Sequence, residues 1–513
     1  THRINCDGAH MAVNLGVFED NKISHLPGFA GTDVDEMAIS SVIGTYAYYN
    51  NYTWNTTNVE GDRIISNFSL RPANITPLIT QETITGNLSQ NVYHDIPVSY
   101  VARMFSLYRG SFKVKFKVVK TEFHSGRLRL NYYLNSDISG GNIPSQTSGN
   151  VHSTIFDLRE STEFEVVMPF AAATPYLPVD VTYARFNLFV ETPLRAVGDV
   201  SNSVDIIMEM AAADDFEFAA PAATTFTPIT YVTTILEAQS GANEPLQKEI
   251  SPSETIGGTT ENVVTTCEAE NCVGEKILSF RQLLKRHTIC MKLCLQQLVF
   301  NGWSFTPDYV FSPYAIPLPN IYDAGGYSGS AADTCWWQPD YFTLVGVLFT
   351  MMRGSVRLSI NDDGPLAYTY GDTIVPSVNM AGPMLNNSSV TANNTQVYHD
   401  AFNGDYPYGR RVLDRFNDLA AAAAYNTNYP DIQMPYYNRT HSSIVPVGPR
   451  LQENGAGSLS CKGPKWCRLP KISTRVRTRV ENTGTTQNWS YREITRAIGE
   501  DFSFGYFTGT YPT

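Results

Sequence analysis

The sequence lacks the segments that would place it in a membrane or in the secretory pathway. No run of apolar residues approaches the roughly 20 that a membrane-spanning helix needs, and the first residues do not resemble a signal peptide. We therefore expect no membrane-spanning segment. We also expect sequons such as Asn51-Tyr52-Thr53 to remain unglycosylated.

The motifs of common metal sites and hydrolases are missing as well. Three cysteine pairs have wider spacings than the Cys-x-x-Cys of common zinc sites, and no histidine cluster accompanies them: Cys267/Cys272, Cys290/Cys294 and Cys461/Cys467. Gly326-Tyr327-Ser328-Gly329-Ser330 has a serine where the hydrolase elbow Gly-x-Ser-x-Gly needs its last glycine. No phosphate loop of the Walker type occurs. We predict reduced thiols, no metal and no cofactor.

Charge of either sign is sparse. Charged residues make up only 17% of the chain, the net charge is −12, and there is no arginine-rich arm, which excludes histone-like binding of nucleic acid. The chain is instead 42% apolar and 12% aromatic, with abundant Tyr, Phe, Thr, Asn, Gly and Pro. This composition favours strands and turns over helices, and 513 residues predict two or three domains.

Two sequence landmarks occur twice and in the same order. Arg109-Gly110-Ser111 is repeated as Arg353-Gly354-Ser355, and each copy precedes alternating apolar and polar residues. Asp214-Asp215-Phe216-Glu217-Phe218 is echoed by Glu500-Asp501-Phe502-Ser503-Phe504 near the end of the other half. Ordered repeats of this kind predict a duplicated domain.

Period-two alternation predicts that each domain is built of strands. Apolar residues from Phe112 to Val118 alternate with Lys113, Lys115 and Lys117, the pattern of a strand with one buried face. About eight such strands with long loops favour a jelly-roll sandwich over an up-and-down barrel. We predict an all-β chain of two eight-stranded antiparallel jelly-roll sandwiches with extended N-terminal arms. Helices are predicted over Asp33–Ile43, Val98–Tyr108 and, as the longest, Gly274–Leu298.

The boundary between the domains is predicted within residues 219–260, which are rich in Ala, Thr, Pro, Ser and Glu and show no periodicity. Within this segment, Gln239-Ser240 suits a protease that reads Gln at the cleaved bond, and a plain flexible linker is the alternative. We place the first domain at residues 1–239, with a core at about 60–220, and the second at 240–513, with a core at about 297–510.

Several motifs resemble the capsid region of picorna-like viruses, above all that of the dicistroviruses and marnaviruses. In the first half, the resemblance to their third capsid protein rests on Gly28–Met37, Tyr52-Thr53-Trp54, Tyr108–Ser111 and Phe123–Leu128. In the second half, Gly274–Ile277 and Leu283–Arg286 are similar to the start of their large five-fold capsid protein. Asp501–Phe507 resembles the C-terminal end of that protein.

The resemblance implies a structural capsid protein of a non-enveloped positive-strand RNA virus. Together with a third jelly-roll protein absent from this chain, 60 copies would form a pseudo-T=3 icosahedral shell that encloses RNA and attaches to a host receptor. It also implies localisation in the virion, assembly in the host cytoplasm and cleavage at Gln239-Ser240 by a viral protease. The host, an arthropod or a marine alga, and the receptor stay open. So does the choice between one uncut precursor and two mature proteins numbered together.

The same resemblance points to a maturation cleavage. Asp214-Asp215-Phe216 is similar to a family motif linked to cleavage of a small internal capsid peptide, and Glu500-Asp501-Phe502 is its altered second copy. Paired carboxylates could supply a proton donor beside a base, since like charges raise one pKa. The alternative is a polar strand end with ordinary solvated acids. No other catalytic residue is predicted.

Contact with packaged RNA is predicted for the basic side of the Gly274–Leu298 segment, because the resemblance places that segment inside the shell. The candidates are Lys276, Arg281, Lys285 and Arg286. A second basic strand face carries Arg475, Arg477 and Arg479, for which a solvated face is the commoner outcome.

Two alternative functions belong to classes other than structural proteins, namely binding proteins and enzymes. A secreted tandem jelly-roll carbohydrate-binding protein would need a signal peptide and paired cysteines, and the sequence has neither. A β-sandwich glycosidase would need two carboxylates from separate strands converging in a cleft, which a sequence does not reveal.

Overall fold

A computed structural model describes two strand-rich regions of the chain, the second of them only in part. The longer described stretches are residues 35–73, 95–134, 152–222 except 199, 275–296, 340–362 and 489–510. The shorter ones are 13–14, 78–84, 88–93, 254–255, 273, 298–300, 303–305, 309–311, 313–314, 316, 334–337, 373–379, 389–391, 424–425, 431–434, 436, 441–445, 452–454, 458–460 and 471–479. The predicted junction Gln239-Ser240 lies outside these residues.

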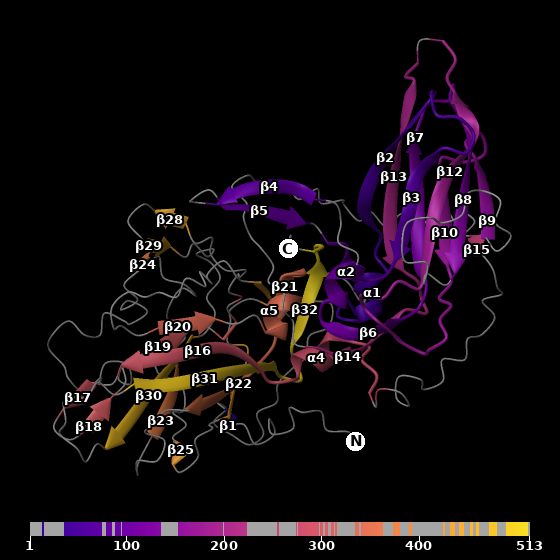
Figure 1. Cartoon of the computed structure of the whole chain (residues 1–513). Coiled ribbons are helices and arrows are strands. Elements are labelled where there is room, and N and C mark those ends of the chain that lie inside the picture. The colour runs from indigo at the N-terminus through magenta and orange to yellow at the C-terminus, as the bar shows by residue number, and fades with distance from the viewer. Residues whose placement is uncertain are drawn as a thin grey trace. The chain divides into compact units, whose positions relative to one another are not determined.

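The chain divides into two compact units whose sequences interleave at their ends. The first unit is Ala38–Phe226, Val232–Leu278 and Thr510–Thr513, and the second is Thr1–Met37, Thr227–Tyr231 and Ser279–Gly509. Each unit therefore contains the residues that lead directly into the other unit's first helix. Figure 1 colours the chain by residue number, so most strands of the first unit are indigo to magenta and most of the second are salmon to yellow.

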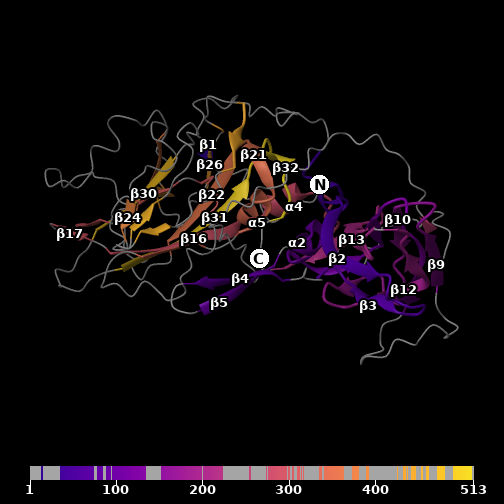
Figure 2. The ribbon, with the colours of Figure 1, turned by 90° about the horizontal axis from the view of Figure 1, so that it is seen from above.

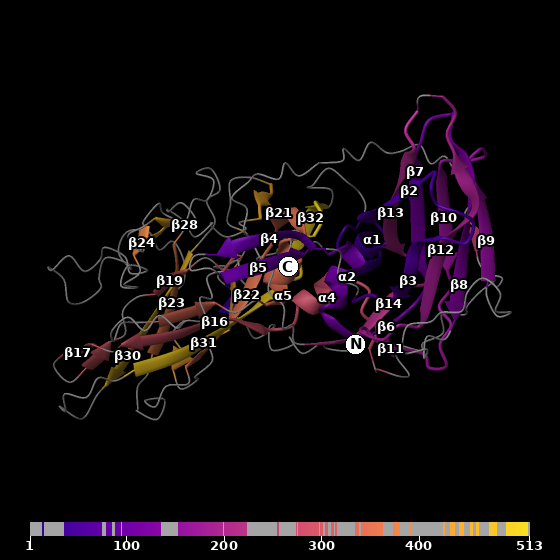
Figure 3. The same ribbon diagram turned by 45° about the horizontal axis from the view of Figure 1, so that its top comes forward.

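The first unit is a jelly roll, as its strand order shows. One sheet runs β2-β13-β7-β10 and the other runs β3-β12-β8-β9 (Figure 3). In chain order these eight strands pair first with last, second with seventh, third with sixth and fourth with fifth, all antiparallel. Nested pairing of this kind is the topology of a jelly roll. The strands are β2 (Ala47–Asn55), β3 (Arg63–Leu70), β7 (Phe112–Val119), β8 (Ser125–Leu134), β9 (His152–Asp157), β10 (Glu163–Met168), β12 (Ala184–Arg195) and β13 (Ser203–Ala212).

Alternation in the sequence explains how these sheets bury one face. Along β7, Phe112, Val114 and Phe116 are at most 1% exposed, while the lysines between them are only half-buried. Burying one such apolar side chain stabilises a fold by about 1.5–3 kcal/mol. The inner faces of both sheets thus form one core, which also contains Trp54 and Phe186.

The second unit repeats the nested order. Its sheets include the paths β16-β31-β22-β26 and β18-β30-β23-β25, with the same four antiparallel pairs. Figure 2 shows β16, β22 and β31 lying along one another. The strands are β16 (Thr288–Gln296), β18 (Trp303–Phe305), β22 (Val356–Asp362), β23 (Thr373–Asn379), β25 (Ala424–Tyr425), β26 (Asp431–Met434), β30 (Lys471–Arg479) and β31 (Trp489–Ile498). The predicted pair of jelly rolls is confirmed.

Smaller elements are duplicated too. A three-stranded sheet has the order β11-β6-β14 in the first unit and β27-β21-β32 in the second. Helices α1 and α2 of the first unit correspond to α4 and α5 of the second. The bounds are α1 (Ile39–Ile43), α2 (Pro97–Ala102), α4 (Phe280–Leu284), α5 (Tyr341–Gly346), β6 (Phe105–Arg109), β11 (Leu177–Pro178), β14 (Glu217–Pro221), β21 (Phe349–Arg353), β27 (Ser443–Ile444) and β32 (Ser503–Phe507).

The remaining strands are short or lie at sheet edges. They are β1 (Val13–Asn14), β4 (Leu78–Ile84), β5 (Leu88–Tyr93), β15 (Glu254–Thr255), β17 (Leu298–Phe300), β19 (Tyr309–Phe311), β20 (Thr334–Trp337), β24 (Ser389–Thr391), β28 (Gln452–Asn454) and β29 (Ser458–Ser460). No helix in the described part of the chain is long and apolar enough to cross a bilayer.

The predicted long helix over Gly274–Leu298 is wrong. Helix α4 ends at Leu284, and the chain then forms β16 between β20 and β31. Of the residues at helical spacing, Phe280 and Leu284 lie in the short helix and Ile277 precedes it. Pairing within the sheet determines the rest, because tertiary context overrides local propensity. The helix predicted over Val98–Tyr108 also ends early, at Ala102, and β6 follows.

Candidate functional site

In the first unit, the two repeated landmarks bind each other. The amide of Ser111 donates to Asp215 Oδ1 at 3.1 Å, and the Ser111 hydroxyl donates to Asp215 Oδ2 at 2.7 Å. The same hydroxyl oxygen accepts the amide of Phe170 at 3.1 Å. Ser111 is buried, whereas the Asp215 residue is exposed. The carboxylate thus ties the start of β7 to the chain just before β14.

The second unit builds the same junction with more burial. The amide and hydroxyl of Ser355 both donate to the carboxylate of Asp501. Here Asp501 is only 7% exposed and Ser355 is fully buried. Gln433 donates to the Ser355 hydroxyl at 3.2 Å, and Arg357 donates to Gln433 at 3.3 Å. Hydrogen bonds to a buried carboxylate are worth more than neutral ones.

A glycine sits at the closest approach in each junction. Gly110 and Gly354 have φ of +118° and +120°, a region that favours glycine. A Cβ on Gly110 would lie 2.3 Å from Cα of Phe216, and one on Gly354 would lie 2.2 Å from Cα of Phe502. The repeated glycine is therefore required both by its φ and by the backbone that passes beside it.

The six residues predicted for maturation cleavage fall into three environments. Asp215 and Asp501 are engaged by the serines just described, and Phe216 and Phe502 are buried in aromatic clusters. The remaining two acids are accessible. Asp214 has a 98% exposed side chain 2.7 Å from Lys113 Nζ. Glu500 is 65% exposed and pairs with Lys285 and Arg357.

The lysines of β7 form a paired face. Lys113 binds Asp214, Lys117 binds Glu209 at 2.7 Å, and Lys115 lies 4.0 Å from carboxylate oxygens of Glu163 and Glu165. Opposite charges across neighbouring strands stabilise a sheet pair by a few tenths of a kcal/mol to about 1 kcal/mol. This face is therefore close to neutral and does not resemble a surface for nucleic acid.

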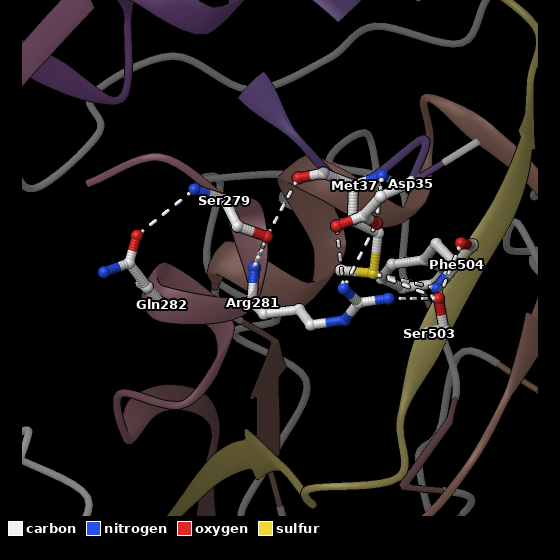
Figure 4. Close-up of polar contacts among 7 residues, drawn as sticks. All are labelled: Asp35, Met37, Ser279, Arg281, Gln282, Ser503 and Phe504. Atoms are coloured by element: carbon white, nitrogen blue, oxygen red, sulfur yellow. Dashed lines mark hydrogen bonds and ion pairs between the residues drawn. The ribbon is translucent and has the colours of Figure 1, made fainter. Parts of the chain in front are cut away.

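The four cations predicted to face RNA lie within or beside α4 in the sequence, and ion pairs are seen for Lys276, Arg281 and Lys285. Lys276 Nζ lies 3.8 Å from Glu217, Lys285 binds Glu500, and Arg281 binds Asp35 at 3.0 Å and the Ser503 hydroxyl at 2.9 Å. Arg286 is half-buried. Figure 4 shows the Arg281 guanidinium directed at the carboxylate of Asp35.

A buried ion pair escaped the sequence analysis. Arg496 donates to both oxygens of Asp340 at 2.7 Å, and its guanidinium lies 4.1 Å from the ring centre of Phe342. Both charged side chains are at most 1% exposed. Asp340 also caps α5 by accepting from the amide of Thr343. The Asp-x-x-Thr spacing before an apolar run was the signal that could have found this cap.

The predictions on metals and thiols can be compared with the described residues only. They contain no group of three or more His, Cys, Asp and Glu side chains that could hold a metal ion. The thiol of Cys290 is buried and donates to the carbonyl of Ile494 at 3.3 Å.

Arg475, Arg477 and Arg479 alternate with other residues along the sequence of β30, as predicted for a strand.

Comparison with known proteins gives one family and several relatives. Residues 266–513 match the family model described as "CRPV capsid protein like". The structural polyprotein of cricket paralysis virus is 26% identical over 572 residues, covering 98% of this chain and 58% of that protein. The structural polyprotein of acute bee paralysis virus is 27% identical over 190 residues, covering 32% of this chain and 20% of that protein.

Solved virus structures match less than half of the chain. A chain of black queen cell virus is 25% identical, with a TM-score of 0.38, and the match covers 43% of this chain and 88% of that one. The chain also spans only 58% of the cricket paralysis virus polyprotein. The sequence relatives do not favour a secreted carbohydrate-binding protein.

Proposed function

We propose that this chain, a region of a dicistrovirus-type capsid polyprotein, forms two of the jelly-roll domains of an icosahedral shell. The observation that supports this most strongly is the nested strand order found twice in one chain. The 26% identity that extends over 98% of the chain to a viral structural polyprotein adds to it. The protein would act by assembling and enclosing RNA, and not by turning over a substrate.

The partners follow from this proposal. A third jelly-roll protein would complete a pseudo-T=3 shell of 60 copies, packed through obligate interfaces that bury several thousand Å² in total. The shell would form in the host cytoplasm, enclose positive-strand RNA and bind an unknown receptor. Expression of the chain together with the matching third protein tests this directly. Closed shells in electron micrographs are expected, and soluble single protomers alone would contradict the proposal.

We further propose that Gln239-Ser240 is a processing junction between the two domains. Gln followed by a small residue in a segment without hydrophobic periodicity supports this assignment. Purified virions should then give two bands and no band at the 57.0 kDa of the intact chain. In the variant Gln239→Ala the chain should remain uncut and give one band at 57.0 kDa.

Among the six predicted residues, maturation cleavage is proposed for Asp214, which is more exposed than the other accessible acid, Glu500. Its exposed carboxylate can approach a substrate, whereas Asp215 and Asp501 already accept two hydrogen bonds from serines. Asp214→Asn should block cleavage of the internal capsid peptide in assembled particles. Asp205→Asn, a matched change on β13, should leave cleavage intact. Normal cleavage in both variants would remove Asp214 from the mechanism.

RNA contact is proposed for Lys276, Lys285 and Arg286. The ion pairs of the two lysines are partly exposed, so they can exchange a carboxylate for a phosphate. Crosslinking of RNA to these residues should fall as salt rises, because binding releases counterions. Crosslinks that persist unchanged in high salt would point to a different mode of contact.

A further inference from the structure

The second unit holds a short acidic segment through both of its carboxylates and through the sulfur and carbonyl of Met37. Asp35, Glu36 and Met37 belong to this unit, while Ala38 already belongs to the first. One nitrogen of Arg281, Nη1, donates to both oxygens of Asp35 at 3.1 and 3.0 Å. The other, Nη2, donates to the hydroxyl of Ser503. Arg281 therefore joins the segment to β32 (Figure 4).

Glu36 is bound by the backbone of β32. The consecutive amides of Tyr506 and Phe507 donate to its two carboxylate oxygens, the second at 3.1 Å. Tyr506 has φ of +62°, which is uncommon for a bulky residue and costs free energy. A left-handed residue between two amides turns both N–H groups to one side, which is how backbone nests bind anions.

Met37 fills the centre of the contact. Its side chain is fully buried, and its sulfur accepts the amide of Phe504 at 3.1 Å. Its carbonyl accepts the amide of Phe280 at 2.9 Å and the hydroxyl of Ser279 at 3.1 Å. The second unit therefore contacts the side chains of three successive residues, two acidic and one apolar.

The equivalent site in the first unit carries an acidic residue and binds a cation instead of a carboxylate. Ala220 takes the same left-handed conformation as Tyr506, with φ of +54°, but Pro221 follows it and has no N–H to donate. Glu217 stands where the second unit has Ser503, and it pairs with Lys276 of the segment that precedes α4. The two units thus differ at the positions that decide which segment they accept.

We propose that the second unit carries a peptide-binding site specific for an Asp-Glu-Met segment, filled by residues 35–37. We call it the acidic-segment site, and its residues are Ser279, Arg281, Ser503, Phe504, Tyr506 and Phe507. The contacts need no chain connection between the site and the segment, so the site accepts the same segment as a separate peptide. This inference is independent of the proposed capsid function.

Binding of a labelled peptide to the full chain tests the proposal. In one variant the site is vacated by Asp35→Ala, Glu36→Ala and Met37→Ala, and the peptide consists of residues 32–40. Fluorescence anisotropy should show at least tenfold tighter binding to this variant than to the unaltered chain, whose site is filled. A peptide with Asp35→Asn and Glu36→Gln should bind at least tenfold more weakly. Equal binding to both chains, or equal binding of both peptides, would overturn the proposal.

Hydrogen exchange provides a second measurement should the triple variant fail to fold. Arg281→Gln removes the bonds to Asp35, and the amides of Tyr506 and Phe507 should then exchange at least tenfold faster. Lys285→Gln is the matched control, because this residue lies just after the same helix and binds Glu500 instead. Exchange at Tyr506 and Phe507 that is the same in both variants would contradict the site.

Discussion

Ser355 and Asp501 are 146 residues apart in the chain, yet the serine gives both its amide and its hydroxyl to the aspartate. Ser111 and Asp215 make the same pair of bonds across 104 residues. The two junctions differ mainly in burial, since Asp215 is exposed and Asp501 is 7% exposed. That difference makes them a matched pair for measuring what burial adds to a charged hydrogen bond.

We expect Ser355→Ala to lower the free energy of unfolding by about 2–3 kcal/mol, because it leaves a buried carboxylate short of a donor. Ser111→Ala should cost about 1 kcal/mol or less, since water can reach Asp215 and replace the hydroxyl. Urea unfolding of both variants gives the comparison. Equal losses would mean that burial of Asp501 has no effect on this bond.

Gly354→Ala should be among the most damaging single changes, with a loss of more than about 2 kcal/mol from the positive φ and the clash with Phe502 together. Gly509→Ala separates the two causes, because Gly509 has φ of +114° but no atom within 4 Å of the place that a Cβ would occupy. Its loss should reflect the backbone conformation alone and be smaller. Thermal unfolding of both variants measures the difference.

Arg496→Met should lower the free energy of unfolding by about 3–5 kcal/mol, because it removes the ion-pair partner of the buried carboxylate of Asp340. Adding Asp340→Asn should recover much of that loss, since asparagine is neutral and can still cap α5. Lys113→Met is the exposed control and should have a much smaller effect, because water screens its pair with Asp214. A double variant no more stable than Arg496→Met would contradict this account.

Stability should fall at alkaline pH because of three buried phenols. Burial raises the pKa of Tyr183, and it does the same for Tyr108 and Tyr132. Neutral phenols are thus favoured in the folded state. Their contribution is complete below the ordinary tyrosine pKa of about 10 and is lost as the pH rises toward the folded values.

The variant Tyr183→Phe tests this titration. It removes one such phenol and the hydrogen bond from its hydroxyl to the carbonyl of Met168. The fall in unfolding free energy between about pH 10 and 11.5 should then be shallower by up to about 1.4 kcal/mol per pH unit. A slope that does not change would show that Tyr183 does not titrate on unfolding.

The fold was predictable from the sequence because its signals are local. Alternation along Phe112–Val119 fixes a strand and its buried face, and the ordered repeats of Arg-Gly-Ser and Asp-Phe predict two equivalent domains. The sequence alone does not reveal that these landmarks bind each other, because no local pattern reports a contact across 104 or 146 residues.

The contacts of the candidate site were not predictable where a partner lies far away in the chain. The sequence around Arg281 predicts an exposed cation on the polar side of a helix. In the structure Arg281 binds Asp35, which lies 246 residues earlier in the chain. The strand β16 was missed for the same reason, since β20 and β31, not the local helical spacing, determine its conformation. The Asp340–Arg496 pair depends on folding as well, because its two members lie 156 residues apart.

The reciprocal placement of the segments before α1 and α4 bears on how much of each half a cell must make. Residues 279–509 produced without residues 35–37 would lack Met37, whose sulfur and carbonyl accept the amides of Phe504 and Phe280. Encoding both halves in one translated chain supplies them in a strict one-to-one ratio.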